Sequence, residues 1–402
     1  MRVLHINKFL FRRGGAERYL FDVAAELTRR GHECSFFGTA HADNVPLALN
    51  RYYPPYRDFA AARPAPGDAL AAVWSRAAAR KLEGFLAHFQ PDVAHVHNIA
   101  YHLTPAILPA LSRAGVAAVM TLHDYNLFCP NHYFYSRDVP CFRCPDGRYF
   151  SCVTRRCVKG RLGPSLVGYA AHLVARRTGV YRRLGRLLVF SDFMRGFAVR
   201  AGFVPDRITL LPPAVNVSAR RAGRKRNYFL YAGRLAPEKG VDELIFAAGL
   251  AEATVAVRVA GDGPERESLT RLAADYAPGR VAFLGPLDDQ ALAAEMAAAR
   301  AVVVPSRWPE NTPAVILEAF AAGTAVVAAR GGGVPELVTD GREGLLYEPG
   351  DVAGLTALLN RLAGPARLAR ELGRAARARA KRDFDFRAHV DRLEAIYREV
   401  AA

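Results

Sequence analysis

The sequence predicts an α/β protein of two successive domains, each built on a parallel sheet with crossover helices. The 402 residues exceed what one compact core holds and suit two domains of roughly 200 residues each. Short apolar runs of strand length alternate with stretches whose apolar residues recur at helical spacing, which is the pattern of doubly wound sheets. This alternation stops at 210–226, which is rich in proline and basic residues, and then restarts. We interpret that stretch as the linker.

The first domain is predicted from residues 1–212. "RVLHI" at 2–6 indicates a buried strand, and the following "GGAERYLFDVAAELTRRG" indicates a helix that ends at Gly31. Helical patterns then separate further strand-like runs, so we expect these runs to pair in parallel. They lie at 33–38, 92–97, 116–123 and 185–190.

The second domain is predicted from residues 213–384. Its strand-like runs lie at 227–233, 253–261, 281–285, 301–306, 324–329 and 344–347. A final helix, 385–402, either caps this domain or crosses back to the first. Because ligands of doubly wound sheets bind at the carboxyl ends of the strands, we expect two Rossmann-like domains that face each other across a ligand-binding cleft.

The stretch "SRWPENTPAVILEAF" at 306–320 places two carboxylates eight positions apart. Thr312 suits the N-cap of a helix and Pro313 suits its first position. Glu310 then falls in the preceding loop and Glu318 in the second helical turn. The free N–H groups of a helix start attract an anion, and a carboxylate can accept hydrogen bonds from two hydroxyls. The pair therefore indicates a site for an anionic polyhydroxyl ligand, and two unrelated surface glutamates are the alternative.

Two further motifs follow predicted strands of the second domain. In "YAGRLAPEKG", Gly233 precedes Arg234, and Lys239 follows five residues after that arginine. Two cations at a strand end can neutralise a diphosphate. In "RGGGVPE", Gly332 and Gly333 allow backbone N–H groups to approach a phosphate or sugar closely. A purely structural turn is the alternative for each motif.

Taken together, these motifs resemble a known family. "GRLAPEKG", "GDGPE", "PSRWPENTPAVILEA" and "GGGVPELV" occur in the order and spacing of the second domain of retaining GT-B glycosyltransferases, in particular glycosyltransferase family 4 (glycosyl transferases group 1). "GGAERYL", "HVHN" and "TLHDY" fit the first domain of the same family. The resemblance covers the chain apart from a cysteine-bearing insert at 126–160.

The resemblance implies a role for each motif. Arg234 and Lys239 would hold the diphosphate of a nucleotide-sugar donor of the UDP or GDP type. Glu310 would contact the transferred sugar, and Glu318 would bind the ribose hydroxyls. His123, at the end of "VMTLH", would touch the sugar near its reacting carbon. Close backbone approach would complete the donor site at Gly14, Gly15, Gly233, Asn311, Thr312, Gly332 and Gly333.

The implied function is transfer of a hexose to a glycan or lipid-linked acceptor with retention of configuration, in cell-envelope polysaccharide or glycolipid synthesis. Catalysis would rest on His123, Arg234, Lys239 and Glu310. Fixed cations can stabilise the charge that develops on the diphosphate, so we expect no catalytic metal or cofactor. Where the family commonly has an aromatic residue or a Phe-Gly pair, this chain has Asn311-Thr312-Pro313. A sugar-nucleotide epimerase of the same architecture is the alternative, and a basic nucleic-acid-binding protein is a more distant one.

The charge distribution suggests where the protein acts. The formal net charge is +17, and residues 1–212 hold 29 Lys and Arg against 14 Asp and Glu, whereas residues 213–402 hold 26 against 24. A basic segment with an apolar face in the first domain is suited to binding an anionic membrane surface. A solvated arginine-rich helix face is the alternative. The chain shows neither a signal peptide nor an apolar run of roughly 18–20 residues. We therefore expect a cytoplasmic protein, peripheral on the inner face of the membrane, with no nucleic-acid partner.

The insert carries five of the six cysteines within 29 residues. Their spacing, C-x11-C-x2-C-x7-C-x4-C, with one C-x2-C pair, predicts structural zinc held by four of them. An iron–sulfur cluster and free or transiently oxidised thiols are the alternatives. The candidate ligands are Cys129, Cys141, Cys144, Cys152 and Cys157.

Overall fold

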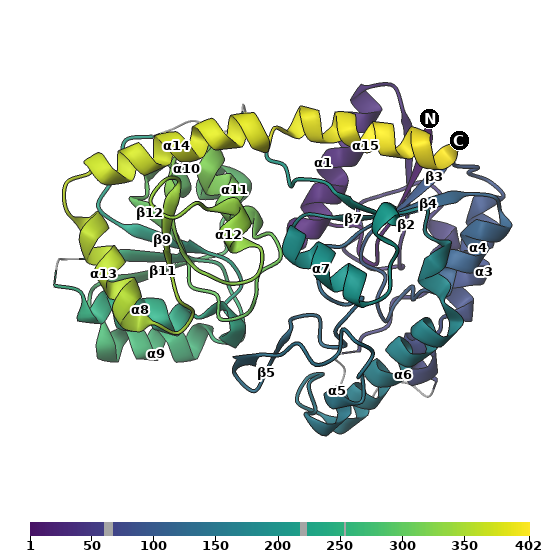
Figure 1. Cartoon of the computed structure of the whole chain (residues 1–402), viewed down its shortest axis with the longest axis horizontal. Helices are drawn as coiled ribbons and strands as arrows, with labels where there is room; N and C mark the ends of the chain where they lie inside the picture. The colour runs from purple at the N-terminus through teal and green to yellow at the C-terminus, as the bar shows by residue number, and fades with distance from the viewer. Residues whose placement is uncertain (60–66, 218–222, 253–254) are drawn as a thin grey trace. The chain divides into compact units, whose positions relative to one another are not determined.

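The computed structural model of the chain describes residues 1–402 except 60–66, 218–222 and 253–254 (Figure 1). The described residues form two compact units. Unit 1 comprises Met1–Ser136, Cys141–Leu211 and Val390–Ala402, and unit 2 comprises Arg137–Pro140 and Pro212–His389.

Unit 1 is built on a parallel sheet with the strand order β2-β1-β3-β4-β7-β8. The strands are β1 (Arg2–Ile6), β2 (Glu33–Phe37), β3 (Val93–Val96), β4 (Ala117–Thr121), β7 (Arg186–Val189) and β8 (Ile208–Leu210). All but β8 lie within predicted runs. The sequence does not predict β8, because its 3 residues are too few to show a periodicity.

Helices join these strands as crossover connections. They are α1 (Gly15–Arg29), α2 (Asp68–Val73), α3 (Arg76–Leu86), α4 (Ile107–Arg113), α5 (Ser151–Thr154), α6 (Leu162–Thr178) and α7 (Asp192–Arg200). Short 3-10 turns are η1 (Asn50–Tyr52), η2 (Val180–Arg183) and η3 (Pro205–Arg207), and the insert holds a small hairpin of β5 (Tyr135–Ser136) and β6 (Val139–Pro140).

Local sequence explains these elements. Strands covered on both faces need apolar side chains on both, which accounts for the near-continuous burial of β1, β3 and β4. Ser191 caps α7, since its side-chain oxygen accepts the N–H of Met194. α1 buries an apolar stripe whose members recur every three or four residues: Leu20, Val23, Ala24 and Leu27.

Unit 2 is built on a second parallel sheet, with the order β11-β10-β9-β12-β13-β14. The strands are β9 (Phe229–Ala232), β10 (Val257–Ala260), β11 (Val281–Gly285), β12 (Ala301–Val304), β13 (Ala325–Ala329) and β14 (Gly344–Tyr347). Alternate residues face opposite sides, so Val303 packs in one core and Val302 in the other. The helices are η4 (Pro237–Lys239), α8 (Val241–Leu250), α9 (Arg266–Tyr276), α10 (Asp289–Ala298), α11 (Ala314–Ala321), α12 (Val334–Leu337), α13 (Val352–Ala363) and α14 (Arg367–Asp383).

The predicted linker, 210–226, differs from a free connection. Val215 and Val217 are buried in the core of unit 2 beside Tyr228, and the residues 218–222 lie outside the described part of the chain. In the described part of this stretch, burial of Val215 and Val217 fixes the chain to unit 2.

The last helix, α15 (Phe386–Ala401), contributes its residues from Val390 onward to unit 1. The Tyr397 hydroxyl lies 2.6 Å from Nδ1 of the fully buried His95. In the residues described here, no helix is both long and apolar enough to cross a membrane.

Candidate functional site

In unit 2, Lys239 and Glu310 form a largely buried ion pair. They follow β9 and β12, which are neighbours in the sheet. Lys239 Nζ donates to Glu310 Oε1 over 2.8 Å, and the Ser306 hydroxyl donates to the same oxygen over 2.6 Å. Lys239 Nζ also lies 4.7 Å from the ring centre of Trp308. Two residues that the sequence analysis assigns to different parts of a donor thus bind each other here.

The glycine turn after β13 holds the backbone of Glu310. The Gly333 N–H donates to the Glu310 carbonyl over 2.8 Å. Gly332 has φ +62°, and a Cβ there would lie 2.0 Å from the same carbonyl oxygen. Another residue would therefore push the two loops apart. Asn311, the next residue of the β12 loop, is also buried.

The start of α11 corrects the prediction for Thr312. Pro313 occupies the N-cap position with φ −68° and ψ 111°, and the helix begins at Ala314 without a side-chain cap. The Thr312 hydroxyl is instead buried and has no hydrogen-bond partner among the described residues. Such a group can donate to a ligand. Glu318 lies in the second turn, as predicted, and is 7% exposed.

Arg234 is held differently from Lys239. It follows Gly233 at the end of β9 and forms an ion pair with Glu238, while 49% of its side chain is exposed. The Gly233 loop meets a second glycine turn closely, since a Cβ at Gly261 would lie 2.0 Å from the Gly233 carbonyl oxygen. Arg234 is therefore placed by a tightly packed turn but remains accessible.

In unit 1, Gly14 is the N-cap of α1 and Gly15 is its first residue. A Cβ at Gly14 would meet Glu17 Oε2 at 3.5 Å, an ordinary contact distance. Glu17 is buried in the first turn, where its Oε1 accepts Nδ2 of Asn7 over 3.2 Å. Asn7 also binds the backbone N–H of Asn98 over 2.9 Å. These bonds tie the ends of β1 and β3 to the start of α1.

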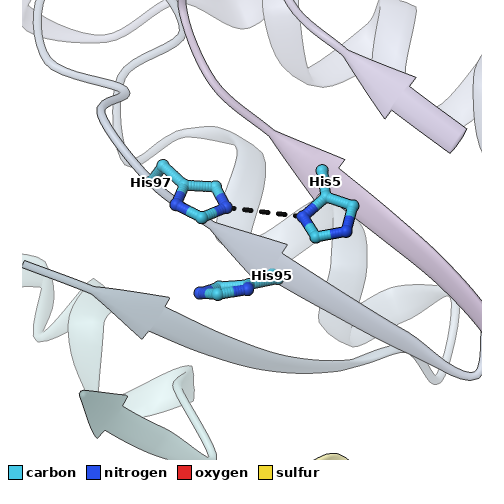
Figure 2. A group of neighbouring side chains, drawn as sticks. All are labelled: His5, His95 and His97. Atoms are coloured by element: carbon cyan, nitrogen blue, oxygen red, sulfur yellow. Dashed lines mark hydrogen bonds between the residues drawn. The ribbon is translucent and has the colours of Figure 1, made fainter. Parts of the chain in front are cut away.

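His123, which is partly exposed, contacts a cluster of buried histidines in the sheet of unit 1. His97 Nδ1 and His123 Nε2 lie 2.9 Å apart, and His97 Nε2 lies 3.5 Å from His5 Nδ1 (Figure 2). The rings of Tyr19 and Phe190 flank His123, with ring centres 5.3 and 5.7 Å away. The strand order β1-β3-β4 brings the three histidines together.

Burial keeps these imidazoles neutral. It lowers the pKa of His123 to about 4 and that of His5 to about 3, and it holds the pKa of His97 well below 6.5. Two neutral rings share one proton between His97 Nδ1 and His123 Nε2. Since Nε2 of His123 faces His97, a hydrogen bond from His123 to a substrate must use Nδ1.

His5, His95 and His97 also meet the spacing of a metal site, with ligand atoms within 4.8 Å of one another. Hydrogen bonds already engage them, however. Nε2 of His95 lies 2.7 Å from the Thr121 hydroxyl, and its Nδ1 lies 2.6 Å from the Tyr397 hydroxyl. A metal ion would have to displace one of these bonds, so we interpret the cluster as a hydrogen-bonded network.

The insert cysteines give the predicted zinc site no support. Cys129 Sγ lies 2.9 Å from Asn131 Oδ1, and Cys152 Sγ lies 3.3 Å from the Ser165 carbonyl oxygen. Burial and neighbouring thiols raise the pKa of Cys129 and Cys152 to about 12. Among the described residues, the histidine cluster is the only group of three or more such side chains with ligand atoms within 4.8 Å. The remaining insert thiols also form no disulfide: Cys141, Cys144 and Cys157.

Several buried polar residues beside these sites are not predicted from the sequence as site residues. Two histidines two positions apart on a buried strand, in "HVHN", were a usable signal, because alternation places them on one face. An acid in the first turn of a helix, in "GGAERYL", was another. The residues are His5, Asn7, Glu17, His95, His97 and Ser306.

Comparison with known families decides the identity of the chain. The sequence profile of Glycosyltransferase Family 4 matches residues 13–219, more than half of the chain, and that of Glycosyl transferases group 1 matches residues 217–379. The chain belongs to glycosyltransferase family 4. The predicted family is therefore confirmed, and the comparisons give no support to an epimerase.

Curated relatives match this family 4 glycosyltransferase over part of their length. Glycogen synthase of Mycobacterium tuberculosis is 35% identical over 184 residues, which cover 45% of this chain and 44% of that protein. D-inositol 3-phosphate glycosyltransferase of Acidothermus cellulolyticus is 35% identical over 226 residues, which cover 50% of each. The chain thus spans about half the length of the curated relatives it matches.

Solved structures match the family 4 chain over almost its whole length. Sucrose-phosphate synthase from Thermosynechococcus elongatus aligns with a TM-score of 0.75 at 19% identity, over 99% of this chain and 98% of that one. HepE of Anabaena, in complex with UDP and glucose, aligns with a TM-score of 0.72 at 20% identity, over 99% and 100%. Identities this low establish the fold alone, and the predicted GT-B fold is confirmed.

Proposed function

We propose that the protein is a retaining, metal-independent hexosyltransferase that moves a sugar from a nucleotide diphosphate to a glycan or lipid-linked acceptor. The loop after β12 carries this proposal: Glu310 is buried, paired with Lys239 and held at its backbone by Gly333. The fold thereby holds the Glu310 carboxylate and the Lys239 ammonium group in fixed positions with little exposure to water. When a donor binds, Lys239 can contact a phosphate and Glu310 a hydroxyl in place of their contact with each other. The loop need not rearrange for this exchange.

The donor would bind in unit 2. Lys239 and Arg234 would bind the diphosphate, Glu310 the sugar and Glu318 the ribose, as the family resemblance implies. The Thr312 hydroxyl is buried and has no hydrogen-bond partner in the described structure. It would donate a hydrogen bond to an oxygen of the nucleotide sugar. A UDP-type donor is favoured by similarity to HepE, whose structure contains UDP.

The chemistry needs few covalent steps from the protein. The bond between the anomeric carbon and the diphosphate oxygen breaks, and its electron pair stays on the diphosphate. The acceptor hydroxyl oxygen then bonds to the same face of that carbon, and its proton passes to the departing phosphate oxygen, which retains the configuration. Lys239 and Arg234 stabilise the charge that develops, and one such group contributes roughly 3–4 kcal/mol to lowering the barrier.

Unit 1 would supply Gly14, Gly15 and His123. Neither the backbone conformation at Gly14 (φ −158°) nor packing around it requires a glycine. Close approach of a ligand to the start of α1 accounts for its lack of a side chain. His123 would bind the sugar through Nδ1.

Thermal-shift screening against UDP-, GDP- and ADP-sugars tests the donor site. A true donor should stabilise the wild-type protein by RT ln(1 + L/Kd), where L is the free donor concentration, so the thermal shift should rise with the logarithm of L above Kd. Glu318→Ala should lose that response while keeping its fold. Equal stabilisation of both proteins by every donor would remove the ribose assignment.

We propose further that the protein is peripheral on the membrane and acts in cell-envelope polysaccharide or glycolipid synthesis. Three apolar side chains are exposed at α5 and the start of α6: Phe150 by 58%, Leu162 by 49% and Leu166 by 45%. The exposed Lys159 and Arg161 lie beside them in the chain. Leu162→Ser/Leu166→Ser should reduce flotation with anionic vesicles. Equal flotation with neutral vesicles would contradict this part of the proposal.

Structural zinc in the insert stays a prediction. Its basis is the close sequence spacing of the five cysteines: Cys129, Cys141, Cys144, Cys152 and Cys157. Elemental analysis of protein purified without chelator tests it. About one zinc per chain, released by a thiol reagent, would confirm zinc. A zinc-free protein with full activity would contradict it.

A further inference from the structure

A cavity of about 600 Å³ lies within unit 1, lined by α6, η2 and the loop after α7. This volume is in the range of small-molecule sites. Part of its wall is apolar and comes from the core, with Leu184 and Leu187 both at most 3% exposed. Ala171 and Ala175 of α6 add small side chains that leave the space open.

The charged side chains of this cavity all carry the same sign. Arg176, Arg182 and Arg207 line it, and no aspartate or glutamate does so among the described residues. All three are exposed, and none forms an ion pair with a carboxylate in the described part of the chain. Arg207 Nη1 donates to the Arg182 carbonyl over 3.2 Å, which places these two residues together. An anion is the complementary ligand.

A smaller void adjoins this cavity on the side of His123. The void measures about 20 Å³ and is lined by His97, His123 and Asp124. Both spaces share Ala100, Asn126, Leu127 and Tyr181 as walls. These shared walls separate the large cavity from the void beside His123, the histidine that the proposed function assigns to the reaction.

We propose that this cavity binds the phosphate ester of a long-chain alcohol, as the carrier of the lipid-linked acceptor. The apolar wall would receive part of the chain, and the arginines would bind the phosphate. The inference rests on the proposed function for its biological meaning, because it names the acceptor class. The binding site itself is defined by residues of unit 1 and does not involve the donor residues of unit 2.

The test uses isothermal titration calorimetry with farnesyl phosphate below its critical micelle concentration. Farnesol, with the same chain and no charge, and inorganic phosphate, with charge and no chain, separate the two contributions. We expect wild-type protein to bind farnesyl phosphate at least tenfold more tightly than either. Equal affinity for inorganic phosphate would overturn the proposal, because binding would then ignore the chain.

Matched variants locate the site. Arg176→Ala/Arg182→Ala should weaken farnesyl phosphate binding at least tenfold. Arg177→Ala/Arg183→Ala removes the same charge from adjacent exposed positions that do not line the cavity, and it should bind within twofold of wild type. Equal losses in both proteins, or no loss in either, would overturn the proposal. Ala171→Phe fills the apolar part and should also weaken binding, whereas unchanged binding would contradict the placement of the chain.

The same proteins are screened in parallel with the donor identified by thermal shift. Cavity variants should keep the donor response while losing farnesyl phosphate. If farnesyl phosphate binds as expected and no nucleotide sugar does, the proposed function fails and the cavity assignment stands. If the donor binds and farnesyl phosphate does not, the cavity assignment fails alone.

Discussion

The two units hold their site residues in opposite electrostatic states. In unit 2 the residues are charged and paired: Lys239 with Glu310, Arg234 with Glu238, and Arg307 with Asp242 and Glu243. In unit 1 the side chains hydrogen-bonded around His123 are neutral imidazoles and hydroxyls, and the adjacent Asp124 is a charged neighbour of His123.

The free-energy cost of burying a charged group explains this difference. A buried ion needs a counter-ion, because desolvation otherwise costs several kcal/mol. Ion pairs in unit 2 therefore keep these side chains charged in the folded protein, as the proposed binding of a diphosphate requires. A neutral imidazole needs only a hydrogen bond, so unit 1 can bury a network that positions His123 without placing a cation beside it.

The largest effect is expected at Lys239. Lys239→Ala should lower kcat/KM by 10²- to 10³-fold, about 3–4 kcal/mol. It should also destabilise the protein by roughly 3–5 kcal/mol, because Glu310 stays buried without its cation. Arg234→Ala is the matched control, since 49% of its side chain is exposed. It should lower activity while changing urea stability by less than about 1 kcal/mol. Equal stability losses would contradict the difference between the two ion pairs.

The next effect tests the glycine turn that holds Glu310. Gly332→Ala places a Cβ 2.0 Å from a backbone oxygen at φ +62°, whereas Gly341→Ala has φ +77° and open space. Gly341→Ala should cost roughly 1–2 kcal/mol from the left-handed conformation. Gly332→Ala should cost a further 1–3 kcal/mol or so from overlap, and it should weaken donor binding. Urea unfolding and donor thermal shift measure both, and equal stabilities would show that the turn yields easily.

Acidification should destabilise unit 1 more than unit 2. The pKa of His5 is about 3 and that of His123 about 4 in the folded chain, below the usual 6.5. The unfolded chain therefore binds protons first, so stability falls as the pH drops below 6.5. Each such histidine removes about 2 kcal/mol by pH 5. Unit 2 contains His389 and no other of the 11 histidines.

The two tryptophans report the units separately, since Trp74 lies in unit 1 and Trp308 in unit 2. Fluorescence of Trp308→Phe should detect a lower urea midpoint at pH 5 than at pH 7. Trp74→Phe should show a smaller change. The reverse order would contradict the neutral histidine network.

The smallest effect is expected at His97, which positions His123. His97→Phe removes the hydrogen bond to His123 and should lower kcat/KM about fivefold, near 1 kcal/mol. His97→Asn, which can still hydrogen-bond, should recover part of this loss. The pH profile of kcat/KM should change with His97→Phe, since the proton of His123 loses its partner. Identical profiles in all three proteins would rule out a positioning role.

Much of the fold could be predicted because buried parallel strands are nearly continuous apolar runs. β1 and β12, for example, are recognisable from "RVLHI" and "AVVVPS". β8 could not be recognised, since "ITL" is too short, and Thr312 was misjudged because Pro313 itself takes the N-cap position. Local preference fixes an element to within a residue or two and no better.

The candidate site was predictable as residues but not as contacts. The motifs place Lys239 after one strand and Glu310 after another, yet 71 residues separate them in the chain. Their hydrogen bond depends on β9 lying next to β12. The same holds for His5, His97 and His123, which meet because β1, β3 and β4 are adjacent.

By itself, the sequence determined the two doubly wound units, the family and the charged and glycine-rich motifs at strand ends. These follow from local periodicity and residue type, which the chain carries before it folds. Only the tertiary structure decided which charges pair, which histidines share a proton and where an arginine-lined cavity opens. Those outcomes depend on strand order and on burial, because both the distance between two groups and the cost of an unpaired charge are properties of the packed chain.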